Sequence, residues 1–209
     1  MNLFGSLTTF VIFFALLIIA MVIHEYAHGW VAYKLGDTTA KYSGRLTLNP
    51  LAHIDIFWTV LIPLIIFIST GFFIAAAKPV PINYWALRNP KRDIILIGAS
   101  GPVSNFILAF LLSILLRVMP QSAIIYSIII NLIYINVMLG VFNLVPIPPL
   151  DGSRVVMGLL PPDLSARYAS IEPYGFIIVT LLFFTGILFR IIWPIITLIM
   201  NSLGVGVPF

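Results

Sequence analysis

Residues 10–28 read FVIFFALLIIAMVIHEYAH, an unbroken apolar run that leads into two histidines and a glutamate. A membrane-spanning helix needs about 20 mainly apolar residues, and this run continues to about Ala32 before Lys34 and Gly36 close it. No positive charge precedes the run and no small-residue cleavage site follows it, so we expect a retained helix rather than a signal peptide. Ionisable side chains therefore lie within a membrane helix.

The composition agrees with this interpretation. Of 209 residues, 61% are apolar and 9% are charged, and the mean hydropathy is +1.11. Soluble proteins are about 45–50% apolar and about 25% charged, so we expect a multi-pass integral membrane protein in contact with the lipid bilayer. The absence of cysteine excludes disulfides, thiolate metal sites and cysteine nucleophiles. The net charge of +4 is spread thinly, which argues against nucleic acid as a partner.

Five apolar blocks are long enough to be membrane segments. They cover about residues 7–32, 54–77, 94–119, 123–144 and 176–200. We therefore predict an all-α membrane bundle that forms one domain over residues 1–209, with a core at about 7–160 and C-terminal helices at about 174–205. The last block is either one kinked helix or two shorter helices. An alternating stretch around Tyr42 to Leu48 predicts a short membrane-associated β-hairpin.

The motif His24-Glu25-Tyr-Ala-His28 is the most informative part of the first block. Histidines at i and i+4 lie on one face of a helix and can bind one zinc ion, while Glu25 beside them can take a proton from a bound water. The alternative is a polar cluster that braces helix packing or conducts protons.

A catalytic zinc takes three protein ligands and one water, and several residues could supply the third ligand. These are His53, Asp37, Asp55, Asp93, Asp151, Asp163 and Glu172. Asp151 follows Asn143-Leu-Val-Pro-Ile-Pro-Pro-Leu, where three prolines end the fourth block. Freed carbonyls at membrane depth need protein or a water-filled cavity around them. Alternatively, Asp151 caps a helix that begins at Ser153.

Together, the HExxH motif and the segment from Asn143 to Gly152 resemble the site-2 protease family of intramembrane zinc metalloproteases. Gly101-Pro-Val-Ser-Asn105 is similar to a third segment of that family. Residues 44–55 and 78–83 look like its compact bacterial and archaeal branch, which lacks a PDZ-like or nucleotide-sensing domain.

The resemblance implies one zinc ion per chain, held by His24, His28 and Asp151, with Glu25 as general base. It also implies that Asn143 orients the peptide or its oxyanion, although this asparagine could simply bond to a freed carbonyl. Two further residues have two readings each. His53 either supports the metal site or is an interfacial histidine, and Asn105 either supports the site or bonds between helices.

The metal site constrains the topology. If the first four blocks all crossed the membrane, His28 and Asp151 would lie at opposite faces and could not share a metal. The second block is the weakest span, interrupted by Pro63 and Gly71, so we predict that it is re-entrant or shallow. Most basic residues then fall on one face, which the positive-inside rule makes cytoplasmic. They are Lys34, Lys41, Arg45, Lys78, Arg88, Lys91, Arg92, Arg154 and Arg167.

We accordingly expect an intramembrane zinc metalloendopeptidase that cleaves transmembrane segments of other proteins, in a prokaryotic cell membrane, with its site opening toward the cytoplasm. Two other classes remain open. A transporter or channel could use the His/Glu cluster for metal ions or protons, and a catalytically silent scaffold could bind membrane helices. The sequence gives no indication of the oligomeric state.

Overall fold

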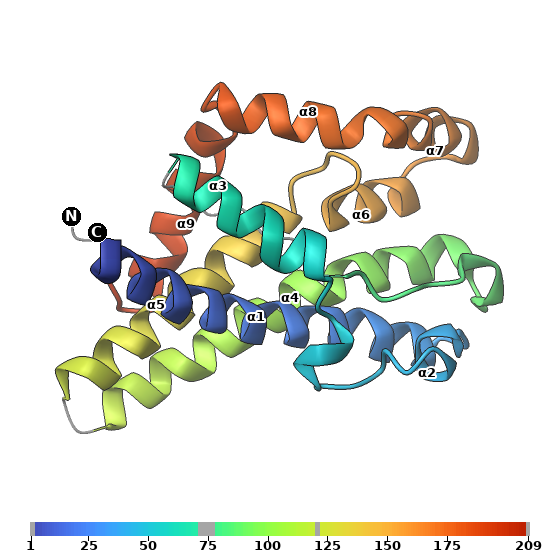
Figure 1. The fold of residues 1–209 in the computed structure, drawn as a ribbon. Helices are drawn as coiled ribbons and strands as arrows, with labels where there is room; N and C mark the ends of the chain where they lie inside the picture. Colours follow the sequence, from blue (N-terminus) through green and yellow to red (C-terminus); the bar gives the residue numbers. More distant parts are fainter. Residues whose placement is uncertain (1–2, 71–77, 120–121, 208–209) are drawn as a thin grey trace.

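The computed structural model describes residues 3–70, 78–119 and 122–207, and every regular element within these ranges is helical. Three helices are long and apolar enough to cross a membrane, namely α1 (Leu3–Lys34), α4 (Pro90–Val118) and α5 (Ala123–Asn143). They lie side by side (Figure 1). The predicted all-α membrane architecture is confirmed.

A fourth crossing is available if two shorter helices act as one span. These are α8 (Glu172–Phe184) and α9 (Ile187–Ser202), which are inclined at 76° to each other. Gly186 lies in the break with φ of 73°, a left-handed conformation that favours glycine. Of the two arrangements that the sequence allowed, the structure therefore contains two helices, and Pro194 lies inside the second.

The second apolar block does not form a single membrane crossing. It contains the π-helical turn η2 (Ile56–Leu61) and the short helix α3 (Ile62–Thr70), while residues 71–77 lie outside the described residues. The N–H of Lys78 donates to the carbonyl oxygen of His53 at 2.9 Å, so the block starts and finishes at the same place. A single crossing would separate its ends by about 30 Å. This geometry agrees with the predicted re-entrant or shallow segment.

The β-hairpin expected around Tyr42 to Leu48 is not formed, and that prediction is wrong. Instead, the chain makes the helical turn α2 (Thr39–Tyr42), which is followed by Ser43 as C-cap and by Gly44 with φ of 69°. The N–H of Arg45 donates back to the carbonyl oxygen of Ala40 at 2.9 Å, as in a Schellman helix end. These local bonds use backbone groups that a hairpin would have paired between strands.

Helix α4 is the centre of the molecule, since it packs against α1, α5 and the short helix α6 (Asp151–Leu159). Small residues on α4 allow these close approaches. The largest apolar core lies between α4, α5 and α9. Its most buried members include Ala109, Ile133, Val137, Leu188, Ile196 and Met200.

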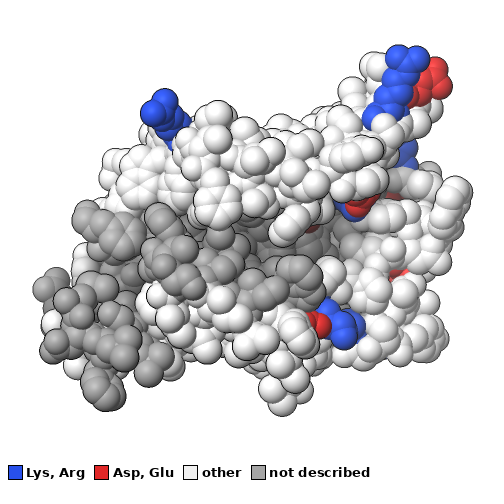
Figure 2. Space-filling model, turned by 45° about the horizontal axis from the view of Figure 1, so that its top comes forward, with Lys and Arg blue, Asp and Glu red and all other residues white. Residues whose placement is uncertain are grey.

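Two hydrogen bonds show which helix ends lie together. The N–H of Arg88 donates to the carbonyl oxygen of Leu35, which places the start of α4 beside the end of α1. At the opposite end of α4, the guanidinium of Arg117 donates to the carbonyl oxygen of Leu203 at 2.9 Å. Helix α6 and helix α7 (Pro162–Ala169) lie at the first of these ends, and on the face drawn in Figure 2 most charged side chains lie toward it.

Candidate metal centre

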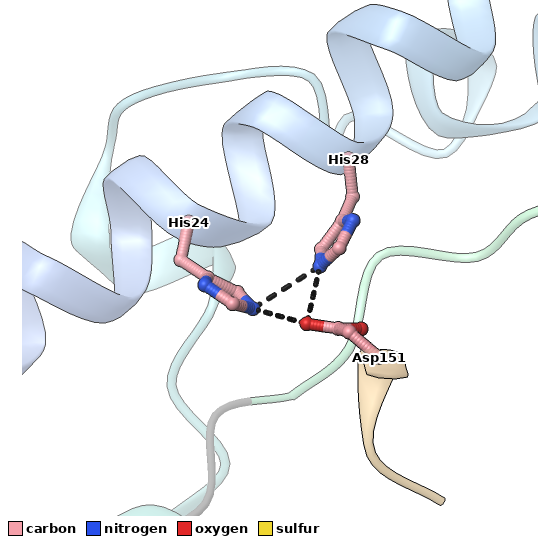
Figure 3. A group of neighbouring side chains, drawn as sticks. All are labelled: His24, His28 and Asp151. Carbon is pink, nitrogen blue, oxygen red and sulfur yellow. Dashed lines mark hydrogen bonds and ion pairs between the residues drawn. The ribbon is translucent and has the colours of Figure 1, made fainter. Parts of the chain in front are cut away.

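Three side chains from two segments that are distant in sequence meet beside α4. His24 and His28 lie one turn apart on α1, and Asp151 is the first residue of α6. Nε2 of His24 is 2.9 Å from Oδ2 of Asp151, and Nε2 of His28 is 3.1 Å from the same oxygen (Figure 3). The two Nε2 atoms are 3.1 Å apart. Within the described ranges, this is the group of His, Asp and Glu side chains that could hold a metal ion.

The helix break before α6 directs Asp151 toward the histidines. Leu150 is the N-cap residue of α6. It has an extended conformation, and its side chain makes no capping hydrogen bond. Gly152 packs so closely on the carbonyl group of Leu144 that any side chain there would collide with it. The Asp151 carboxylate consequently faces α1, which is not the arrangement of an aspartate that caps a helix beginning at Ser153.

Each histidine ring is oriented by the nitrogen that points away from the centre. Nδ1 of His24 donates to Oδ1 of Asn105 at 2.6 Å, and Nδ1 of His28 donates to the carbonyl oxygen of Ile97 at 2.7 Å. Because both partners are acceptors, each Nδ1 bears a hydrogen, and whenever a ring is neutral its Nε2 lone pair points into the centre. Three electron-rich atoms therefore converge, an arrangement that requires a proton or a metal cation between them.

The amide of Asn105 is itself fixed by a network across three helices. Its Nδ2 donates to the carbonyl oxygen of Ala20 on α1 at 3.2 Å and to Oδ1 of Asn136 on α5 at 2.8 Å. Nδ2 of Asn136 in turn donates to the carbonyl oxygen of Leu132 at 2.8 Å. Both asparagines are 0% exposed. Since Nδ2 of Asn105 has two acceptors, Oδ1 is the atom that faces His24.

Gly101 provides the space in which the two rings meet. A Cβ atom built on this glycine would lie 2.6 Å from Nε2 of His24 and would also collide with Nε2 of His28. The absence of a side chain at this position on α4 is therefore a requirement of the centre.

Glu25 lies next to His24 on α1, and its side chain is partly buried. Its Oε2 accepts the N–H of Val80 at 2.8 Å. Val80 belongs to the extended segment that follows the re-entrant block. The carboxylate is thus held by a backbone donor from a segment distant in sequence.

The other predicted site residues lie apart from the three side chains. Nε2 of His53 donates to the carbonyl oxygen of Thr47 at 2.9 Å, and the residue lies near Met21 and Val22 on α1. This is the side of α1 that carries Glu25, and no described hydrogen bond joins His53 to the centre. Nδ2 of Asn143, the last residue of α5, donates to the carbonyl oxygen of Leu139 at 3.0 Å.

Four of the five other carboxylates considered as third ligands have other partners, among them Asp55, which accepts the N–H of Phe57. Asp37 accepts the N–H groups of Thr39 and Asn83, and Asp93 accepts the N–H of Asn89 at the start of α4. Glu172 forms an ion pair with Arg154.

The pKa of Asp151 reflects competing influences. Burial raises it, but hydrogen bonds to His24 and His28 and the charges of these rings when protonated lower it further, to about 2. Asp151 lies outside the spanning helices. Its carboxylate is therefore ionised throughout the neutral pH range and is ready to bind a cation.

Comparison with known proteins identifies the family. The sequence profile described as Peptidase family M50 matches residues 118–185, which include Asp151. The Bacillus subtilis (strain 168) protein named "Putative zinc metalloprotease YwhC" is 41% identical over 192 residues, which are 86% of this chain and 83% of that protein. The chain belongs to peptidase family M50. This is the site-2 protease family that the motifs resemble, so the chain is a zinc metalloprotease.

Other similar proteins also have names that describe zinc metalloproteases. The Mycolicibacterium smegmatis protein named "Putative zinc metalloprotease Rip2" is 29% identical over 199 residues, which are 94% of this chain and 76% of that protein. The Methanocaldococcus jannaschii protein named "Zinc metalloprotease MJ0392" is 27% identical over 149 residues, which are 71% of this chain and 34% of that protein. No solved structure gives a significant match.

The centre of this M50 protease fits zinc. Tetrahedral ligand atoms at about 2.0–2.1 Å from zinc lie about 3.3 Å apart, and the three atoms here are 2.9–3.1 Å apart. A slight outward movement is enough for all three to bind one ion. Two imidazoles and one carboxylate form a donor set used by catalytic zinc sites, which keep a fourth position open.

Two parts of this M50 centre were not identified from the sequence. Asn136 stands out in the sequence as a polar residue inside an apolar block. The sequence does not indicate that it binds Asn105, because Asn105 lies on another helix. The contact between Val80 and Glu25 could not be inferred from residue types, because the group that binds Glu25 is a backbone N–H.

Proposed function

We propose that this M50 protease is an intramembrane endopeptidase that hydrolyses peptide bonds within transmembrane segments of other proteins. His24, His28 and Asp151 would hold one zinc ion per chain, and Glu25 would act as general base. The observation that supports this most directly is the convergence of three acceptor atoms at a membrane-spanning helix.

The depth of the centre favours a membrane-embedded substrate. His24 precedes Lys34, the last residue of α1, by ten positions, or about 15 Å of helix. This is about half of the 30 Å hydrocarbon thickness. A transmembrane segment has access to this depth, whereas a soluble folded protein has little. The proline-rich break before Asp151 adds polar backbone groups at the same site.

The chemistry assigns a task to each residue. A helical substrate would first unwind, because its amides are locked in hydrogen bonds. Bound zinc lowers the pKa of water and polarises a carbonyl group. Glu25 would accept a proton from the attacking water and pass it to the leaving amine. Asn143 uses one of its two amide hydrogens on Leu139, so the second could bind the substrate carbonyl oxygen.

We also propose that the chain works as one domain over residues 1–209 in a prokaryotic cell membrane, with its site opening toward the cytoplasm. The relatives reported above come from bacteria and an archaeon. On the face drawn in Figure 2, most charged side chains lie toward the end of the bundle where α1 finishes and α4 begins, as expected of a cytoplasmic side. The partners are then the lipid bilayer and a membrane-protein substrate.

The test uses purified protein in lipid nanodiscs with single-span reporter proteins as substrates. We expect wild type to cleave a reporter within its transmembrane segment, as located by mass spectrometry. Glu25→Gln should keep its zinc and lose cleavage, whereas Asp151→Ala should lose both. Cleavage by Glu25→Gln would remove Glu25 from the mechanism. Cleavage of extramembrane peptides alone would leave a protease but refute the intramembrane substrate.

A further inference from the structure

The extended segment Lys78–Asn83, here called the strap, is fixed at both ends. The N–H of Lys78 donates to the carbonyl oxygen of His53 at 2.9 Å. The N–H of Asn83 donates to Oδ2 of Asp37 at 2.7 Å, and Asp37 is 0% exposed. The strap is therefore held by hydrogen bonds at both ends, which fixes the position of its middle residues.

The middle of the strap lies on α1. The side chain of Val80 is 6% exposed, and its Cγ1 atom would be 3.1 Å from a Cβ built on Gly29, which is one turn after Glu25. Gly29 thus lets the strap approach the helix closely. This packing brings the N–H of Val80 to 2.8 Å from Oε2 of Glu25.

The strap offers Glu25 a single backbone donor. Pro79 and Pro81 have no N–H, so within residues 79–81 the N–H of Val80 is the only one present. A glutamate has several rotatable bonds, and a hydrogen bond to the charged carboxylate is stronger than one between neutral groups. Holding Oε2 leaves Oε1, for which the described part of the chain supplies no hydrogen-bond donor.

We propose that the N–H of Val80 is a positioning group for Glu25, which holds one carboxylate oxygen so that the other faces the attacking water. This inference rests on the proposed role of Glu25 as general base. A base must lie within hydrogen-bond reach of the proton that it takes, and a freely rotating carboxylate would spend much of its time elsewhere. The strap, reached after the re-entrant block, thereby contributes to the reaction through Glu25.

The mutational test compares two variants at one position. Val80→Pro removes the N–H in a segment already extended, and Val80→Ala keeps the N–H while removing the side-chain methyl groups. The ratio of the kcat values of the two variants therefore measures the effect of removing the N–H. We expect full zinc content in both, a similar KM, and a kcat at least about tenfold lower for Val80→Pro than for Val80→Ala. Equal kcat values, or a higher kcat for Val80→Pro, would overturn the proposal.

If Val80→Pro does not fold, replacing the Val80 amide by an ester during cell-free synthesis removes the same N–H with a one-atom change. The same tenfold or greater loss of kcat is expected. Wild-type kcat in the ester protein with full zinc content would refute the positioning role.

A second measurement does not depend on activity. Because residues 79–81 contain one backbone amide hydrogen, its deuterium exchange reports on Val80 alone. We expect protection in wild type, with or without zinc, and at least about tenfold faster exchange in Glu25→Ala. Unprotected exchange in wild type would contradict the inference. An active wild type with an inactive Glu25→Gln but an unimpaired ester protein would refute this inference and leave the proposed function intact.

Discussion

A Cβ atom on Gly101 would lie 2.6 Å from Nε2 of His24, so the smallest possible side chain on α4 would reach into the metal centre. We expect Gly101→Ala to lower zinc affinity by at least about tenfold, because the collision pushes both histidines away from Asp151. Metal analysis after titration with a competing chelator measures this. Gly206→Ala is the control, since a Cβ there meets nothing within 4 Å. Full zinc affinity in Gly101→Ala would contradict the geometry.

The hydrogen bond between Lys78 and His53 predicts the topology of the second block. Single cysteines introduced at Thr38 and Trp85, both exposed, should react from the same side of the membrane, and one at Ser122 from the opposite side. The natural chain has no cysteine, so each variant has one reactive group. Labelling with an impermeant maleimide in cells and in inverted vesicles gives the result. If Trp85 is labelled only from the outer side, the re-entrant arrangement is wrong.

Asn105 should control zinc affinity through His24. Asn105→Leu removes the acceptor of the His24 Nδ1 hydrogen, and we expect zinc to bind about 10- to 100-fold more weakly. Asn105→Asp keeps an acceptor and should recover part of this loss. Competition with a fluorescent zinc chelator provides the affinities. Leucine and aspartate variants that bind zinc equally well would show that the asparagine only packs the helices.

The lowered pKa of Asp151 has a consequence for the metal-free protein. A carboxylate with a pKa of about 2 instead of its ordinary value contributes stability that is fully present above about pH 4. This contribution, about 2 kcal/mol at neutral pH, should fall to about half at pH 3 and disappear as the pH falls below about 2. Thermal unfolding of wild type and Asp151→Asn in detergent with a chelator measures it. A difference between the two proteins that does not shrink from pH 5 to pH 3 would argue against the pairing.

Several features could be predicted because they depend on local sequence. The i, i+4 spacing places His24 and His28 on one face of any helix, and the prolines before Asp151 end the fourth block wherever it packs. Even the re-entrant block could be inferred, since a metal shared between α1 and α6 restricts which segments cross.

Other features depend on contacts between distant residues. The bonds from Asn105 to His24 and from Val80 to Glu25 join different segments, and no periodicity in one segment reveals its partner in another. The predicted hairpin failed for a local reason. The alternation of apolar and polar residues around Tyr42 to Leu48 is typical of a strand. Gly44, however, allows a helix end whose hydrogen bonds satisfy the same backbone groups.

The amide of Asn105 on α4 forms hydrogen bonds to Ala20 and His24 on α1 and to Asn136 on α5. One side chain therefore fixes the axial positions of three helices relative to one another. Sliding one helix by a single residue, about 1.5 Å, would stretch or break one of these bonds. Membranes of different thickness change helix tilt and offset. A bilayer whose thickness forced these helices to shift would therefore act on the orientation of the His24 imidazole.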